Sequence, residues 1–298
     1  APRAPLGAAR PSSRWYAREP EGVTQEEEEE PVQSEPVQSE PVRREAPGPW
    51  YGDGSRLVAR TWHCPLTGRT VRYLAGRVAP RTEPDCQDDE PVVFYLAGLG
   101  DAGNVDNPKM LRKRFYHIQG LNLRPFLFLV PFRPPGDWWC IKGDDARYGY
   151  LGEIVLETLD LLANLVEDLA GSRKIIGLGF SAGAYCLTEL LALGRPKFSA
   201  MAFGGLHGHG QADLDGIPKA RHEGVLDKYE AWLERLGGHS GVDGGIFAMH
   251  SEDDGWSPKR YAKPALQALG ARNVELGLPR VRFTALPSGK GHKYEDEA

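Results

Sequence analysis

Short apolar runs alternate with longer amphipathic stretches along the larger, C-terminal part of the chain. The first two runs, residues 57–63 and 69–78, flank a turn-like Pro-Leu-Thr-Gly and predict an antiparallel hairpin. Further short runs predict buried strands, and the stretches between them carry apolar residues at helical spacing. The predicted strands are 91–98, 126–130, 175–178, 199–203, 245–250 and 281–286, and the predicted helices are 151–170, one that ends at residue 194, 220–236 and 264–269.

This alternation of strand and helix patterns predicts an α/β fold. Consecutive parallel strands need a crossover connection, usually a helix, so the order implies a mainly parallel central sheet with helices on both faces. The leading hairpin adds an N-terminal antiparallel element to that sheet. We therefore expect one folded domain, residues 50–298.

Residues 1–49 have a different composition. Residues 26–30 are all glutamate, and the pentapeptide Pro-Val-Gln-Ser-Glu occurs twice between residues 31 and 40. A segment with so few apolar side chains cannot bury enough surface to offset the entropy lost on ordering. We interpret it as a disordered acidic, proline-rich tail or linker that serves for docking onto a partner.

Charge and cysteine content restrict the partners and the compartment. The formal net charge is −5, which argues against an electrostatic interaction with nucleic acid or anionic lipid. The longest strongly apolar run, residues 125–132, is too short to be a transmembrane segment. Four scattered cysteines form no C-x-x-C pair, so we expect reduced thiols in an intracellular protein, cytoplasmic or organellar, with a processed N-terminus.

The candidate chemistry centres on Ser181. The sequence Gly-Phe-Ser-Ala-Gly, residues 179–183, joins the apolar run 175–178 to a helical pattern. In the Gly-x-Ser-x-Gly motif the chain turns sharply from a strand into a helix, and glycines flank the serine because a Cβ has no room there. Ser181 Oγ would then stand above the sheet as a nucleophile. The alternative is a glycine-rich turn whose serine only caps the helix.

Three further segments accompany this motif. Ala-Gly-Leu-Gly-Asp, residues 97–101, follows the first buried strand, residues 251–258 follow the strand 245–250, and His292 follows a glycine after the last strand. Together with Gly-Phe-Ser-Ala-Gly they resemble the α/β-hydrolases. Within that superfamily the chain is most similar to the phospholipase/carboxylesterase group, which includes acyl-protein thioesterases. The resemblance covers about residues 91–292.

The resemblance implies a triad in the chain order nucleophile, acid, histidine. Residues 250–258 are similar to the family's His-Gly-x-x-Asp-x-x-Val-Pro loop, in which the matching carboxylate is Asp254. Asp253 is the neighbouring alternative, and a solvated acidic turn would also suit these residues. His292 would be the general base that serine needs within hydrogen-bond reach, and the acid would orient it.

Two backbone amides, those of Leu99 and Ala182, would form the oxyanion hole. Gly98 would let the backbone approach the substrate closely, although an ordinary strand-to-helix turn also uses glycines. Ala97 replaces the family's usual histidine, and Ala182 replaces its glutamine. Activity can survive both changes because the oxyanion donors are backbone groups.

Other residues bear on substrate and cofactor. Trp138 and Trp139, after the second parallel strand, either line an acyl or aromatic pocket or pack in the core. His207 and His209 invite a metal interpretation, but two histidines without a third ligand do not make a metal site. We expect neither a metal nor a cofactor.

The sequence thus predicts a serine hydrolase that cleaves a carboxylic ester or thioester, on a small-molecule or acylated substrate, through an acyl-enzyme. Two alternatives stay open. One is a non-catalytic, hydrolase-like binding protein, and the other is an acyltransferase that uses the same triad.

Overall fold

The computed structural model describes residues 57–78, 89–98, 124–133, 139–142, 152–206, 222–254 and 259–287. All of them belong to one unit of the chain, Glu45–Ala298. The predicted tail, residues 1–49, lies outside the described residues, and so do Leu99, Trp138, His207, His209 and His292.

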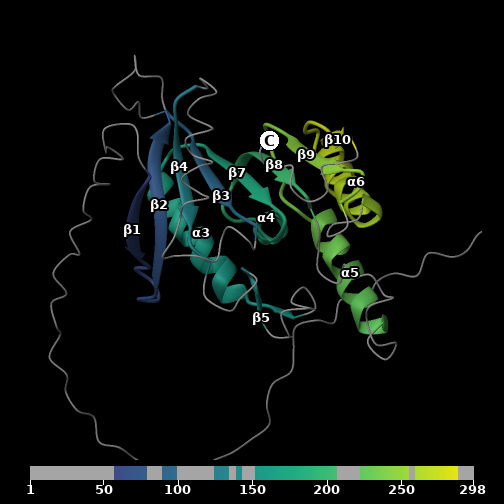
Figure 1. Ribbon diagram of the computed structural model, residues 1–298, viewed down its shortest axis with the longest axis horizontal. Helices are drawn as coiled ribbons and strands as arrows, with labels where there is room; N and C mark the ends of the chain where they lie inside the picture. The colour runs from purple at the N-terminus through teal and green to yellow at the C-terminus, as the bar shows by residue number, and fades with distance from the viewer. Residues whose placement is uncertain are drawn as a thin grey trace, which may run out of the picture. The chain divides into compact units, whose positions relative to one another are not determined.

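An eight-stranded sheet has the order β1-β2-β4-β3-β7-β8-β9-β10 (Figure 1). Only β2 runs antiparallel to its neighbours, β1 and β4, and all other neighbouring strands are parallel. The predicted mainly parallel sheet with an N-terminal hairpin is therefore confirmed. The strands are β1 Val58–His63, β2 Thr70–Val78, β3 Val92–Leu96, β4 Phe126–Pro131, β7 Ile175–Phe180, β8 Phe198–Gly204, β9 Ile246–Ser251 and β10 Arg282–Leu286.

The structure describes four helices, which follow one another along the sheet (Figure 1). They are α3 Leu156–Ala170, α4 Ala182–Leu193, α5 His222–Gly237 and α6 Lys259–Glu275. Helix α4 is central, because it contacts β3, β7 and β8 as well as α3 and α5. Ten of its residues are buried, and the helix ends at Gly194, as the sequence predicts, with Gly194 in the left-handed conformation.

The predicted helix 151–170 begins later than expected, because a small second sheet takes its first residues. Strand β6, Glu153–Ile154, pairs antiparallel with β5, Ile141–Lys142. The Val155 N–H donates to Cys140 O at 2.7 Å, and α3 starts only at Leu156. The apolar spacing could not show this pairing, since its partner strand is more than ten residues away in the sequence.

Two further helix predictions need correction. Helix α6 is much longer than the predicted 264–269, and Pro264 lies inside it rather than at its start. In α5, the helical spacing of the apolar residues predicts Leu226 on the apolar side, but Leu226 is 46% exposed. The second half of α5 contacts α4, where Trp232 of α5 packs against Tyr185 of α4.

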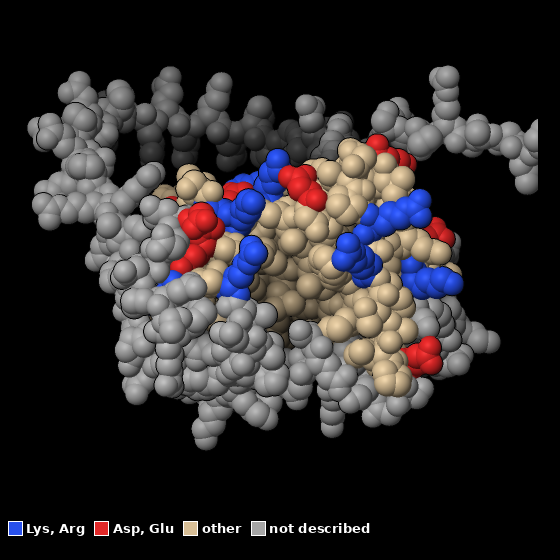
Figure 2. All heavy atoms as spheres, turned by 90° about the horizontal axis from the view of Figure 1, so that it is seen from above, with Lys and Arg blue, Asp and Glu red and all other residues tan. Residues whose placement is uncertain are grey.

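Charged side chains lie at the surface with few exceptions. Figure 2 shows one face on which described Lys, Arg, Asp and Glu side chains lie on either side of a depression formed by uncharged residues. Among the described residues, the buried charged ones are Arg77, Glu90, Glu189 and Asp254. Arg77 Nε donates to both carboxylate oxygens of Glu90 at 3.0 and 2.9 Å. A buried charge is costly unless it is paired, so this pair has a structural role at the amino edge of the parallel strands.

Candidate active site

Ser181 joins the end of β7 to the start of α4. Its backbone has φ 53° and ψ −121°, a region that residues other than glycine rarely adopt. The Ser181 N–H donates to Gly204 O at 2.8 Å, and Ser181 O accepts from the Tyr185 N–H at 3.1 Å. The serine side chain makes no capping hydrogen bond to the helix. The structure therefore does not support side-chain capping of α4 by Ser181.

The two glycines of the motif are required by close contacts. A Cβ on Gly179 would lie 2.7 Å from Ala184 Cα, and a Cβ on Gly183 would lie 1.9 Å from Leu96 O. Neither distance is compatible with a side chain, since both neighbours are backbone atoms. The spacing Gly-x-Ser-x-Gly thus follows from the tight packing of the turn between β7, α4 and the end of β3.

The turn after β3 reaches the serine. A Cβ on Gly98 would lie 3.4 Å from Ser181 Cβ and 3.0 Å from Phe180 Cδ1. The Ala182 amide is at the first position of α4, where a helical N–H has no intrahelical partner. The structure thus brings together Ser181, Ala182 and Gly98, and a substrate carbonyl between them would meet the positive end of the α4 dipole.

Trp139 is not exposed to solvent at all. Its indole Nε1–H donates to Ala97 O at 2.9 Å, and its backbone has φ 53°, as Ser181 has. This placement favours the packing alternative for Trp139 over a role in lining a pocket. Sequence reasoning missed the contact with Ala97, and the separation of 42 positions left no local signal for it.

Asp254 lies three residues beyond β9 and is buried, with 4% of its surface exposed. His250 lies close to its carboxylate, with Nε2 at 4.0 Å from Asp254 Oδ2. Asp253 is exposed, and its Oδ1 accepts a hydrogen bond from Ser251 Oγ at 2.5 Å. A buried carboxylate suits the orientation of a histidine better than an exposed one, so this difference favours Asp254.

The carboxyl ends of β7, β8, β9 and β10 lie at one edge of the sheet. Gly204 O at the end of β8 accepts from Ser181, and the next amide, that of Gly205, donates to Met249 O of β9 at 3.2 Å. In β10, Leu286 is paired with Ser251 of β9. The chain that leads to His292 therefore leaves the sheet beside the loop of Asp254, although His292 itself is outside the described residues.

The described residues hold no cluster of three or more His, Cys, Asp or Glu side chains that suits a metal ion. Cys64, Cys140 and Cys186 are buried and free. Burial raises the pKa of the Cys140 thiol, and hydrogen bonding to Cys186 raises it further, which makes this thiol a weak nucleophile. None of the described helices has the length and apolar character that crossing a membrane requires.

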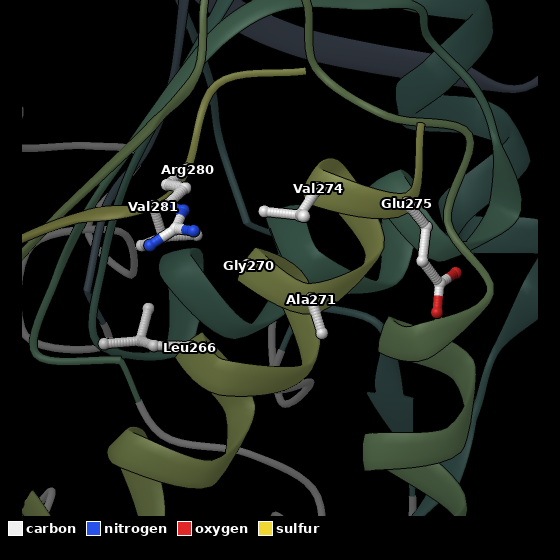
Figure 3. Close-up of a pocket in the computed structure, with 7 residues that line it drawn as sticks. All are labelled: Leu266, Gly270, Ala271, Val274, Glu275, Arg280 and Val281. Atoms are coloured by element: carbon white, nitrogen blue, oxygen red, sulfur yellow. The ribbon is translucent and has the colours of Figure 1, made fainter. Parts of the chain in front are cut away.

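A hollow of about 480 Å³ lies between α6 and the residues just before β10 (Figure 3). Arg280 and Val281, which contribute to it, immediately precede β10, whereas the candidate site follows the carboxyl ends of the strands. The hollow therefore carries no part of the candidate site. Its lining residues are Leu266, Gly270, Ala271, Val274, Glu275, Arg280 and Val281.

The chain is similar in structure to several hydrolases. A thermostable esterase is 20% identical with a TM-score of 0.50, and the match covers 80% of this chain and 56% of the esterase. A candidate dienelactone hydrolase from Klebsiella pneumoniae is 14% identical with a TM-score of 0.51, covering 81% of this chain and 90% of that one. The acylaminoacyl peptidase of Pyrococcus horikoshii is 15% identical with a TM-score of 0.53, covering 81% and 38%.

This chain spans little more than half of the thermostable esterase. No protein-family model and no curated protein matches the sequence. At these identities the structural likeness concerns the fold alone. The described part of the chain therefore has the α/β-hydrolase fold.

Proposed function

We propose that this protein is a serine hydrolase that cleaves a carboxylic ester or thioester through an acyl-enzyme. The single observation that carries the proposal is the strained backbone of Ser181 at the junction of β7 and α4. Strain of this kind persists only where the surroundings impose it, and it is concentrated at functional sites. An ordinary strand-to-helix turn has no need of a non-glycine residue in this conformation.

In the proposed mechanism, Ser181 Oγ attacks the substrate carbonyl while His292 accepts the hydroxyl proton. The amides of Ala182 and Leu99 bind the oxyanion of the tetrahedral intermediate. Collapse of the intermediate expels the alcohol or thiol, which takes the proton from His292 and leaves the acyl group on Ser181. Water then attacks the acyl-enzyme, with His292 again accepting a proton and returning it to Ser181 Oγ.

Asp254 is the proposed partner of the His292 imidazole. A carboxylate shielded from water interacts more strongly with a developing imidazolium than an exposed one does. The burial of Asp254 and its place at the carboxyl end of β9 support this role.

Within the α/β-hydrolases, we propose a member of the phospholipase/carboxylesterase group. The support is the sequence Ala-Gly-Leu-Gly-Asp at residues 97–101 together with Gly-Phe-Ser-Ala-Gly at residues 179–183. A series of p-nitrophenyl esters and matching acyl thioesters, from short to long acyl chains, tests this assignment. The assignment would be contradicted if the protein hydrolysed other bonds but turned over neither the esters nor the thioesters.

The decisive test of the function is covalent labelling. A fluorophosphonate should add to the wild-type protein once, and peptide mapping should place the adduct on Ser181. Ser181→Ala should abolish labelling and lower turnover by on the order of a million-fold, if the triad acts as a unit. Ser172→Ala, an exposed serine in the turn before β7, is the control and should label normally.

Absence of labelling in the folded wild-type protein would leave the non-catalytic binding protein as the better description. Acyl transfer is distinguished by its products. In the presence of water and an added alcohol or amine, a hydrolase releases mainly the free acid, whereas an acyltransferase releases mainly the new ester or amide.

A further inference from the structure

The indole of Trp139 contacts the turn that would carry the oxyanion hole. Its Nε1–H donates to Ala97 O at 2.9 Å, and both residues are at most 1% exposed. Water cannot replace this hydrogen bond at a site so far from the surface. The indole of Trp139 therefore helps to determine where the Ala97 carbonyl points.

The orientation of this carbonyl has a direct consequence for the next residues. The peptide bond is planar and trans, so Ala97 C=O and Gly98 N–H lie in one plane and point in opposite directions. Fixing the carbonyl fixes this plane, and with it the direction of the Gly98 N–H. Gly98 is also the residue of this turn that lies against Ser181.

The turn is held from a second side by the nucleophile helix. A Cβ on Gly183 would lie 1.9 Å from Leu96 O and 2.7 Å from Ala97 O. The carbonyl of Ala97 thus lies between α4 and the indole of Trp139. Contact with α4 limits movement of the turn towards the helix, and the hydrogen bond from Trp139 limits rotation of the Ala97 carbonyl.

Trp139 is itself held in a strained conformation. Together with Ser181, it is one of two non-glycine residues with positive φ in the described part of the chain. The residues that follow it are anchored, because Cys140 O accepts from the Val155 N–H at 2.7 Å and the Cys140 and Cys186 side chains are hydrogen-bonded. These contacts join the Trp139 segment to β6 and to α4.

We propose that Trp139 is a positioning residue for the oxyanion hole, acting through Ala97 on the loop that carries the Leu99 amide. This inference rests on the proposed hydrolase function. A tryptophan that only fills the core would affect stability and the yield of folded protein. A positioning residue affects the step in which negative charge develops on the substrate oxygen.

The test removes the N–H donor and leaves an aromatic ring. Trp139→Phe should lower kcat on the order of 10- to 100-fold, less than the loss of a complete oxyanion donor, with KM changed by less than about threefold. The inhibition constant of a trifluoromethyl ketone, which forms a tetrahedral adduct with the serine, should rise in parallel with the fall in kcat/KM. Binding of the corresponding unactivated ketone should be unchanged.

Trp232→Phe is the matched control. Trp232 is equally buried, and its Nε1–H donates to Thr188 Oγ1 at 3.2 Å, in the contact between α4 and α5. Its loss removes an indole hydrogen bond of the core without touching the Ala97 turn. We expect Trp232→Phe to be destabilised while its kcat stays within about twofold of the wild type.

If Trp139→Phe does not fold, replacement of Trp139 by β-(3-benzothienyl)alanine decides the question, because sulfur takes the place of the N–H and the shape of the ring system is kept. The proposal is overturned if a folded Trp139 variant shows the kcat and ketone affinity of the Trp232 control. Turnover that does not depend on Ser181 in the wild type would instead overturn the proposed function, so the two failures are distinguishable.

Discussion

Gly183 lies against the carbonyl oxygen of Leu96, where a Cβ would be only 1.9 Å away. The two residues belong to α4 and to the end of β3, so the nucleophile helix starts in direct contact with the strand that leads to the oxyanion turn. The contact explains why the motif ends in glycine, and it fixes the distance between Ser181 and Gly98.

Gly183→Ala should therefore disrupt the fold locally and remove activity. The methyl group meets backbone atoms and cannot be accommodated by a rotamer change, so we expect a loss of about 3 kcal/mol in the free energy of unfolding. Urea unfolding followed by circular dichroism measures it. Gly237→Ala is the control, since a Cβ there has no neighbour within 4 Å. Equal stability of Gly183→Ala and Gly237→Ala would contradict the packing described for α4 and β3.

The two neighbouring aspartates should differ sharply. Asp254→Asn should lower kcat by roughly four orders of magnitude, because the amide favours the wrong tautomer of the histidine. Asp253→Asn removes the charge of an exposed side chain but keeps an oxygen that can accept from Ser251 Oγ, so it should keep kcat within about threefold. Steady-state kinetics of the two isosteric variants gives the comparison directly. The reverse ranking would assign the triad acid to Asp253.

The ion pair between Arg235 and Glu189 should contribute to stability. Arg235 Nε and a terminal guanidinium nitrogen donate to the two carboxylate oxygens of Glu189 at 3.0 and 2.7 Å, and Glu189 is 3% exposed. Arg235→Met leaves a buried carboxylate without its ion-pair partner, which should cost about 3 kcal/mol.

Arg69→Met is the control for this measurement. Its pair with Glu157 has a similar distance, 3.1 Å, but the two side chains are 54% and 78% exposed. Such a surface pair contributes at most about 1 kcal/mol. Equal destabilisation of both variants in urea would show that burial of Glu189 is not what matters.

His239 should make the stability depend on pH. Its Nδ1 accepts from the Gly241 N–H at 2.9 Å and its Nε2–H donates to Leu269 O at 3.2 Å, so the folded protein holds the neutral ring. Burial lowers the pKa of His239. The unfolded chain then binds a proton at a higher pH than the folded one, near the usual value of about 6.5.

The stabilising contribution of neutral His239 is therefore complete above about pH 6.5 and is lost as the pH falls through the lower, folded pKa. Urea unfolding between pH 8 and pH 5 should show this loss in the wild type and a smaller loss in His239→Gln. An identical pH dependence in the two proteins would exclude His239 as its source.

Local patterns in the sequence were sufficient for the central elements. The apolar run before Ser181 and the helical spacing after it are consecutive in the chain, and they predicted β7 and α4 with the turn between them. The parallel sheet followed from the repeated alternation of such units. The identity of Ser181 as the residue at the turn needed only the two flanking glycines.

Contacts between distant parts of the chain could not be predicted in this way. The start of α3 depends on the pairing of β6 with β5, and the place of Trp139 depends on a hydrogen bond to a residue in a different strand connection. The exposure of Leu226 depends on how much of α5 packs on α4. Each is decided by tertiary packing, which apolar periodicity does not encode.

Strand β10 is the last strand of the described sheet, and four of its five residues are exposed. The segment that contains His292 follows β10 in the chain, and β10 is attached to the sheet through its parallel pairing with β9. Segments with few buried contacts open at a smaller free-energy cost than the global transition. If β10 frays at the edge of the sheet, His292, the proposed general base that follows it, would no longer be held near Ser181. Activity in dilute denaturant would then fall before the hydrophobic core around α4 unfolds.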